Sequence, residues 1–247
     1  LKRLFMGSLA LLFATTAVAT IFATTGSSPT GIVIDAAGNL YVANALSDNV
    51  SKITPDGTST ILGATGDYPS GIAIDAAGNV YTSNVDSTNI TKITPGGVSS
   101  NYGTTGARPY SMVLDAAGNV YTANYNSSNV SKIEPDGTST IFATTGAFPG
   151  DIAIDAAGNL YTANNSKNVS KITPGGASSI LGDTDGTPRG IAVDPSGTVY
   201  TSNATTGGEN SPGSVSKITS NGTSTILAAT GSFGYDIAID TLGNVYT

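Results

Sequence analysis

The seven residues Asp115-Ala116-Ala117-Gly118-Asn119-Val120-Tyr121 decide the fold of this chain because the same pattern returns at regular intervals. Copies of the same or a closely related heptad begin at Asp35, Asp75, Asp155, Asp194 and Asp240. The steps between the six leading aspartates are 40, 40, 40, 39 and 46 residues. A period of this length is typical of proteins built from one repeated supersecondary unit. The uninterrupted period predicts one repeat domain.

Each heptad is predicted to form a hairpin turn. An alternating apolar stretch such as Gly71-Ile72-Ala73-Ile74 precedes it, and another such as Val80-Tyr81-Thr82 follows. Two β-prone runs joined by a polar connector with Gly and Asn are typical of a hairpin. The Asp can accept hydrogen bonds from its own turn, and Gly supplies the positive φ. A calcium loop would need oxygen ligands where this heptad has Ala, so we interpret the aspartates as turn residues.

One unit, from Ser111 to Gly146, is predicted to contain four strands. We expect them at 111–115, 119–124, 129–134 and 138–144. Four short strands in about 40 residues are typical of a propeller blade. The sequence therefore predicts an all-β fold, a six-bladed β-propeller that covers residues 20–247.

The two ends of the repeat region are incomplete units. Residues 20–26 match 140–146, the fourth strand of a unit, whereas 236–247 supply a first and a second strand. A strand contributed by the opposite terminus would leave few open sheet edges. We therefore expect the last blade to be shared by both termini and to be incomplete in this sequence.

The N-terminus departs from the repeat. Lys2 and Arg3 precede an apolar run over 4–13, and Ala17-Val18-Ala19 follows with small residues at both ends. A charged start, an apolar centre and a small-residue cleavage motif are typical of a secretory signal peptide. We predict a signal peptide over residues 1–19 and a secreted protein, extracellular or periplasmic, without membrane insertion after cleavage. The alternative is that 9–19 forms a strand of a degenerate unit.

Composition narrows the classes of function. The net charge is −7, and nucleic-acid binding and docking on anionic lipid both need basic patches. The chain has no Cys, which excludes disulfides, and no His, the commonest general base and metal ligand. We expect a monomer with no cofactor, no metal, no catalytic residue set and no nucleic-acid partner.

Two further residue types recur once in each unit. The lysines stand at positions 52, 92, 132, 171 and 217, and we interpret them as charges that protect outer strands from edge pairing. The last heptad residues are the tyrosines at 41, 81, 121, 161, 200 and 246. We expect these rings to pack between neighbouring blades rather than to stack on a ligand.

The stretch Gly71 to Tyr81, followed by Asn89-Ile-Thr-Lys92-Ile-Thr-Pro95-Gly-Gly97, resembles NHL-repeat propellers. It is also similar to the related streptogramin-lyase-like repeats of secreted bacterial proteins. The resemblance covers residues 20–247 and implies six blades and a binding or scaffold role, with some enzymes among the relatives.

The enzymes of these families can be compared with this chain residue by residue. Streptogramin lyases use a catalytic His and NHL-type amidating lyases hold zinc through His, and this chain has none. Gluconolactonase-like propellers hold a divalent cation with Glu, Asn and Asp. This chain has two glutamates, Glu134 on a predicted outer strand and Glu209 in a loop insertion, and neither is expected at an inner-strand ligand position.

The near-identity of the units favours a binding or structural module over an enzyme. A catalytic site needs its acid and its base at one place only, and such a site usually breaks the symmetry of the repeat. We therefore predict a non-catalytic module that binds a glycan, peptide or protein. The alternative is a divalent-cation-dependent lyase or hydrolase, lactonase-like, with its site at the central channel. A purely structural surface module is a third hypothesis.

Ligand contacts are predicted at one end of the blades. The Asp-x-x-Gly and Pro-x-Gly turns share one end, whereas the loop between strands two and three and the links between blades share the other. Variation concentrates at this second end, and function tends to lie on loops held by a rigid scaffold. The predicted ligand-binding residues are Tyr110, Arg189 and Tyr235, with Asn44, Asn84, Asn124, Asn164 and Asn203 at the ends of the second strands. The alternative for the asparagines is that they cap strand ends.

Overall fold

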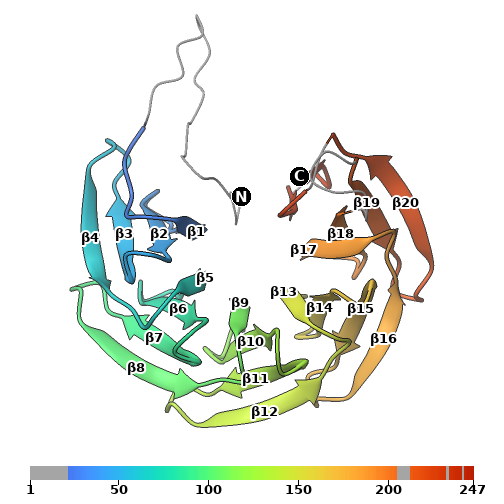
Figure 1. The fold of residues 1–247 in the computed structure, drawn as a ribbon, viewed down its shortest axis with the longest axis horizontal. Coiled ribbons are helices and arrows are strands. Elements are labelled where there is room, and N and C mark those ends of the chain that lie inside the picture. Colours follow the sequence, from blue (N-terminus) through green and yellow to red (C-terminus); the bar gives the residue numbers. More distant parts are fainter. Residues whose placement is uncertain (1–21, 205–211, 232–233, 241) are drawn as a thin grey trace, which may run out of the picture. The chain divides into compact units, whose positions relative to one another are not determined.

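The structure is a computed structural model that describes residues 22–204, 212–231, 234–240 and 242–247. All regular elements in these ranges are β-strands, as the sequence predicts. They form five four-stranded sheets and one two-stranded sheet within the described ranges. In each large sheet the strands pair antiparallel in chain order, which Figure 1 shows as successive hairpins. No helix in the described part is long and apolar enough to cross a membrane.

The strands of the first three sheets are β1 (Pro29–Ile34), β2 (Leu40–Asn44), β3 (Asn49–Ile53), β4 (Ser59–Ala64), β5 (Pro69–Ile74), β6 (Val80–Asn84), β7 (Asn89–Ile93), β8 (Ser99–Thr104), β9 (Pro109–Leu114), β10 (Val120–Asn124), β11 (Asn129–Ile133) and β12 (Ser139–Thr144). The remaining strands are β13 (Pro149–Ile154), β14 (Leu160–Asn164), β15 (Asn168–Ile172), β16 (Ser178–Asp183), β17 (Thr187–Val193), β18 (Val199–Ala204), β19 (Ser214–Ile218), β20 (Ser224–Ala229), β21 (Ala238–Ile239) and β22 (Val245–Tyr246). The predicted boundaries of the unit at 111–144 are correct to within two residues.

A bulge recurs in the outer half of the sheets. In the pairing of β3 with β4 the register shifts between Val50 and Ser51. The same shift stands between Val130 and Ser131 and between Val169 and Ser170. An extra residue in one strand bends it and increases the local twist. The extra residue lies in the fourth strand, where Leu62 stands between Ile61 and Gly63, the partners of Ser51 and Val50.

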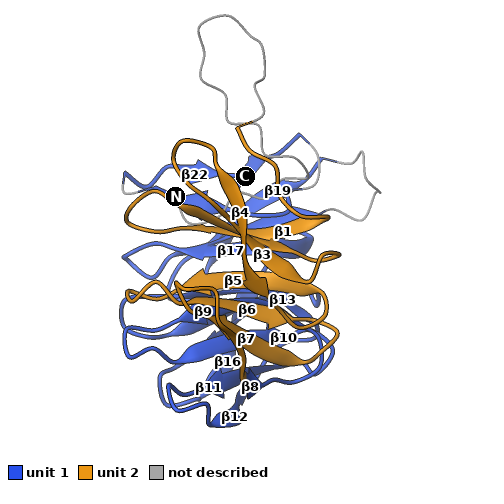
Figure 2. Ribbon diagram, turned by 90° about the vertical axis from the view of Figure 1, so that its left-hand side faces the viewer, with its two compact units in different colours: residues 1, 103–247 blue, residues 2–102 orange. Residues whose placement is uncertain are grey.

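The chain forms two compact units, residues 2–102 and 103–247 (Figure 2). Within each unit, the first strands of consecutive sheets contact each other: β1 with β5, β9 with β13, and β13 with β17. The apolar core lies between consecutive sheets rather than inside one. In one such cluster Ala123 and Val130 pack with Ile152, Leu160 and Ile172 of the next sheet.

Strand β14 shows why the second strands carry few exposed residues. Its residue Leu160 packs toward the preceding sheet, whereas Tyr161 and Ala163 pack toward the following one. A strand that is covered on both faces has no solvent side, and all five residues of β14 are buried. Alternation in these strands therefore separates two cores and not core from water.

The N-terminal segment follows the path of a fourth strand. A Cβ on Gly57 would lie 2.8 Å from the backbone oxygen of Phe22, as one on Gly176 would lie 3.0 Å from that of Phe142. The described residues 22–25 nevertheless carry no strand assignment. Residues 1–21, and with them the predicted signal peptide, lie outside the described residues, and the shared sixth blade stays a prediction.

Candidate functional site

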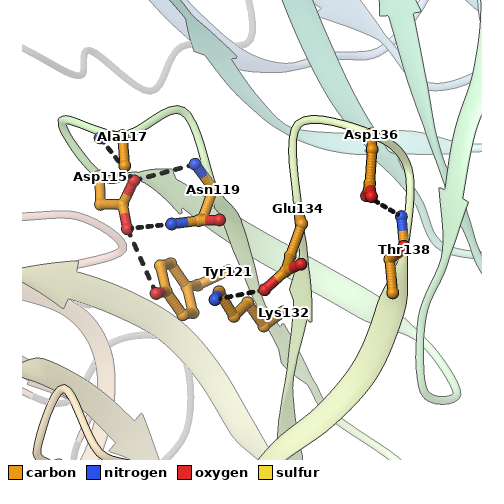
Figure 3. Close-up of polar contacts among 8 residues, drawn as sticks. All are labelled: Asp115, Ala117, Asn119, Tyr121, Lys132, Glu134, Asp136 and Thr138. Carbon is orange, nitrogen blue, oxygen red and sulfur yellow. Dashed lines mark hydrogen bonds and ion pairs between the residues drawn. The ribbon is translucent and has the colours of Figure 1, made fainter.

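The heptad carboxylates are fully engaged in their own turns. Asp115 Oδ1 accepts hydrogen bonds from the amides of Ala117 and Asn119 at 2.9 Å, and Oδ2 accepts from Asn119 Nδ2 at 2.7 Å and from the Tyr121 hydroxyl at 3.3 Å (Figure 3). Gly118 has φ 83°, which closes the turn. Four donors saturate the carboxylate, so the turn interpretation of the aspartates agrees with the geometry.

These hydrogen bonds influence the protonation states of Asp115 and Tyr121. Burial pushes the pKa of Asp115 upward, but the bonds from Asn119, Ala117 and Tyr121 outweigh it and hold the pKa below its usual value. Burial, together with the neighbouring Asp115 charge, raises the pKa of Tyr121 to about 12. Near pH 7 Asp115 is therefore ionised and Tyr121 is neutral, so the pair forms a stable hydrogen bond and does not supply a proton for catalysis.

The repeated lysines lie on the third strand, inside the sheet edge, which corrects our assignment of them to exposed edges. Lys92 Nζ lies 5.4 Å from the centre of the Tyr81 ring and 5.3 Å from that of Tyr102. A cation over an aromatic face is attracted by the ring quadrupole. Lys132 instead forms an ion pair with Glu134 at 2.8 Å (Figure 3). The edge strand β12 carries no charged residue, whereas the edge strand β16 ends at Asp183.

The asparagines at the ends of the second strands are internal. The side chains at positions 44, 84, 124, 164 and 203 are all completely buried. Asn84 Nδ2 donates to Asn89 Oδ1 at 2.7 Å and to Thr91 Oγ1 at 2.9 Å, and its Oδ1 accepts from Thr82 Oγ1 at 3.0 Å. Burial and these bonds favour strand fastening, the alternative that the sequence left open, and the ligand-binding role of the asparagines stays a prediction.

Asn44 is the exception in this series. Its Nδ2 donates to Asn49 and Ser51, but its Oδ1 has no hydrogen-bond partner among the described residues. The position that supplies a Thr hydroxyl in the other units is Val42 in this one. A missing hydroxyl two residues away therefore explains the orphaned oxygen.

Left-handed backbone conformations mark the same end of the sheets. The residues with positive φ other than Gly stand at two places in the units, before the Pro of the first strand and before the third strand. They are Ser28, Tyr68, Arg108 and Phe148, and Asp48, Thr88, Ser128 and Lys167. This conformation costs an L-residue other than Gly or Asn roughly 1–2 kcal/mol. The chain nevertheless carries large side chains there.

Three aromatic rings gather at this end in the unit of residues 103–247. The rings of Tyr110 and Tyr125 meet edge to face with centroids 5.1 Å apart, and Tyr125 and Phe148 lie 5.2 Å apart at 41°. The Arg108 guanidinium lies 5.7 Å from the centre of the Tyr110 ring. Asn165 Nδ2 donates to the Tyr125 hydroxyl at 2.5 Å. We call these five residues the Tyr125 cluster.

Of the predicted ligand-contacting side chains, Tyr110 alone belongs to this cluster. Arg189 is exposed on β17, and its side chain makes no hydrogen bond or ring contact within the described part. Tyr235 is 61% exposed and follows β20. Their ligand-binding role stays a prediction. The sequence reasoning did not select Arg108, Phe148 and Asn165, although a comparison of matching positions would have shown that they break the repeat.

A second departure from the repeat lies on the first strands. Asp151 is 5% exposed and accepts hydrogen bonds from the Ser111 hydroxyl on β9 and from the Ile191 amide on β17 at 3.0 Å. Its own neighbour Ile152 donates to the same carboxylate at 2.9 Å. One buried carboxylate thus joins three consecutive sheets.

No metal centre is visible in the donor sets. Among the residues that the structure describes, no group of three or more His, Cys, Asp or Glu side chains could hold a metal ion. Glu134 is engaged with Lys132, and Glu209 lies outside the described residues.

Solved structures share this arrangement of sheets. A catalytically inactive histidine-to-alanine variant of virginiamycin B lyase from Staphylococcus aureus, with quinupristin, matches with a TM-score of 0.73 and 19% identity over 85% of this chain and 74% of that one. A gluconolactonase from Xanthomonas campestris matches with a TM-score of 0.66 and 16% identity over 90% and 82%. A nidogen/laminin complex contains a chain that matches with a TM-score of 0.68 and 17% identity over 85% and 84%. The fold is thus a β-propeller, and five full sheets with one partial sheet agree with six blades.

The family follows from a match that spans almost the whole sequence. Residues 15–246 match the model of the virginiamycin B lyase family. The chain therefore belongs to that family, as the resemblance to streptogramin-lyase-like repeats implied. No curated protein matches the sequence.

Proposed function

We propose that this chain is a secreted, non-catalytic binding module that holds a glycan, peptide or protein at the end of the blades where the second strands finish. The observation that carries the proposal is the bulk of the left-handed residues Tyr68, Arg108 and Phe148. Stability alone would favour Gly or Asn at these positions. Phe148 is nevertheless 46% exposed and Tyr68 36% exposed, so their rings are only partly used by the fold. Strained backbone that presents exposed aromatic residues is typical of a binding surface.

The test replaces these three residues by Asn, which tolerates the left-handed conformation. We expect the triple variant Tyr68→Asn/Arg108→Asn/Phe148→Asn to fold with equal or higher thermal stability than the wild type. On glycan and peptide arrays, the variant should no longer bind the ligands that the wild type binds. Tyr102→Asn, in a ring contact with Tyr81 away from this end, serves as the control for loss of an aromatic residue. Undiminished binding by the triple variant would refute the proposal.

Family membership supports a second candidate, a divalent-cation-dependent lyase or lactonase acting at the central channel. The absence of His from all 247 residues weighs against lyase chemistry of the kind lost in the inactive histidine variant. Incubation of the purified protein with quinupristin or with a gluconolactone, each with and without Mg²⁺, decides between the candidates. We expect mass spectrometry to show both compounds unchanged, and conversion above the spontaneous rate would favour the enzyme.

Secretion is part of the same proposal. The charged start, apolar run and Ala17-Val18-Ala19 motif support cleavage after residue 19. We expect mass spectrometry of exported protein to find an N-terminus near Thr20. Exported protein that retains Leu1 would contradict this cleavage.

A further inference from the structure

We propose that the Tyr125 cluster binds one pyranose ring of an uncharged glycan, with the sugar stacked on the aromatic rings and its hydroxyls bonded to Arg108 and Asn165. This inference rests on the proposed binding function and adds the place and the class of ligand. The cluster breaks the repeat. The positions that match Tyr110 hold Thr30, Ser70, Gly150, Arg189 and Tyr235, and those that match Tyr125 hold Ala45, Val85, Asn165 and Ala204, so the two tyrosines occur together in this unit alone.

The rings are held in place before any ligand arrives. Tyr125 lies between Tyr110 and Phe148, and both centroid distances are within the range of favourable ring pairs. The hydrogen bond from Asn165 fixes the hydroxyl end of Tyr125, and the Arg108 guanidinium covers Tyr110. A preformed surface loses little conformational entropy on binding, which is a large cost for mobile side chains.

The cluster is open to solvent. Phe148 and Arg108 are exposed, and Tyr110, Tyr125 and Asn165 are half-buried. The apolar face of a pyranose ring, lined by C–H groups, can therefore reach an aromatic face without displacing a neighbouring element.

The polar groups of the cluster suit hydroxyls. Arg108 forms no salt bridge among the described residues, so its planar set of donors is available beside the rings. The amide of Asn165 adds a second planar group. No carboxylate belongs to the cluster, and the net charge of −7 disfavours a polyanionic ligand. An uncharged glycan matches this combination.

The backbone argues against an extended peptide that adds a strand here. Tyr125 N–H donates to the Arg108 carbonyl at 2.9 Å, and Asn126 N–H donates to Ala107 at 3.2 Å. In the next unit, Asn165 N–H donates to the Phe148 carbonyl at 3.1 Å. Peptide recognition by strand addition needs unpaired backbone groups, and these are already bonded to each other. Recognition at this place falls to side chains.

The experiment measures retention of the protein on xylan, mannan and chitin as uncharged probes, on polygalacturonate as a charged probe, and on a peptide array. We expect binding to at least one uncharged polysaccharide. Phe148→Ala and Tyr125→Ala should each weaken it about tenfold, the size of a lost ring contact. Tyr102→Ala is the control for loss of an aromatic ring, because Tyr102 contacts Tyr81 away from this end of the blades. It should leave the affinity within about twofold.

Because Tyr125→Ala also removes packing, Tyr125→Phe and circular dichroism separate binding from folding. Tyr125→Phe keeps the ring and loses the hydroxyl that Asn165 holds, so we expect a smaller loss than with Tyr125→Ala. Preference for polygalacturonate, equal effects of Phe148→Ala and Tyr102→Ala, or no retention on any uncharged polysaccharide would overturn the inference. Peptide binding that the triple Asn variant abolishes would overturn the inference and leave the proposed function standing.

Discussion

A single hydroxyl separates one unit from the others at the scale of the residue. In the other full units a Thr on the second strand donates to the buried Asn oxygen, as Thr162 does to Asn164 at 2.9 Å. Val42 occupies this position in the first unit, and Asn44 Oδ1 is left without a partner among the described residues. A buried acceptor that lacks a hydrogen bond costs about 1–3 kcal/mol.

We therefore expect Val42→Thr to raise the free energy of unfolding by about 1 kcal/mol, because the new hydroxyl lies where its counterparts lie. Urea unfolding followed by circular dichroism measures the change. The matched control is Thr162→Val, which creates the same defect in another unit and should destabilise by about 1–2 kcal/mol. A loss of stability in Val42→Thr would show that Asn44 is satisfied in another way.

At the scale of the element, consecutive sheets are joined by polar bonds as well as by the apolar core. Asp151 on β13 binds Ser111 on β9 and the Ile191 amide on β17 while almost fully buried. The first strands lie at the inner side of each sheet within this unit (Figure 1). Loss of this carboxylate would leave a buried amide unpaired.

Asp151→Ala should lower the free energy of unfolding by about 2 kcal/mol, since it removes an acceptor shared by three strands. The control is Asp136→Ala, an exposed turn residue whose carboxylate accepts from the Thr138 amide at 2.9 Å in its own hairpin (Figure 3). Thermal unfolding of both variants provides the comparison. Equal shifts in the two variants would contradict a role for Asp151 in joining the sheets.

At the scale of the whole molecule, the same lowering of an aspartate pKa recurs in every heptad. Hydrogen bonds, against the opposing effect of burial, lower the pKa of the leading aspartates in all six heptads, at positions 35, 75, 115, 155, 194 and 240. For Asp240 the bond from Asn244 comes first among the causes, and the pKa falls to about 2. A group with a depressed folded pKa stabilises the fold above its unfolded pKa of about 3.9 and loses that contribution as pH falls through the folded value.

We expect a melting temperature that changes little between pH 7 and pH 5 and falls steeply below about pH 4, since the leading aspartates of the six heptads lose their charge over the same range. Differential scanning calorimetry from pH 7 to pH 2 measures it. Asp115→Asn should melt lower at pH 7 and show a shallower fall in acid. A melting temperature that stays constant down to pH 2 would contradict the role of these carboxylates.

The turns and the fold class could be predicted from the sequence because their causes are local. A heptad such as Asp75 to Tyr81 contains its own acceptor, its own positive-φ Gly and the strand residues on both sides. Because the heptad returns about every 40 residues, each interval predicts one more four-stranded unit of the same kind. The strands at 111–144 accordingly lie within two residues of their predicted bounds.

The candidate site required the tertiary structure because its members meet only when consecutive sheets pack side by side. Tyr125 and Asn165 stand 40 residues apart and bond through packing, which no local pattern encodes. The burial of residues such as Asn84, which favours strand fastening over ligand contact, is likewise visible only in the tertiary structure, since the sequence shows an amide but not whether water reaches it. The location of Lys92 over two rings, inside the edge, depended on the same packing. Local chemistry thus determined the elements, and the contact between elements determined what their surfaces can bind.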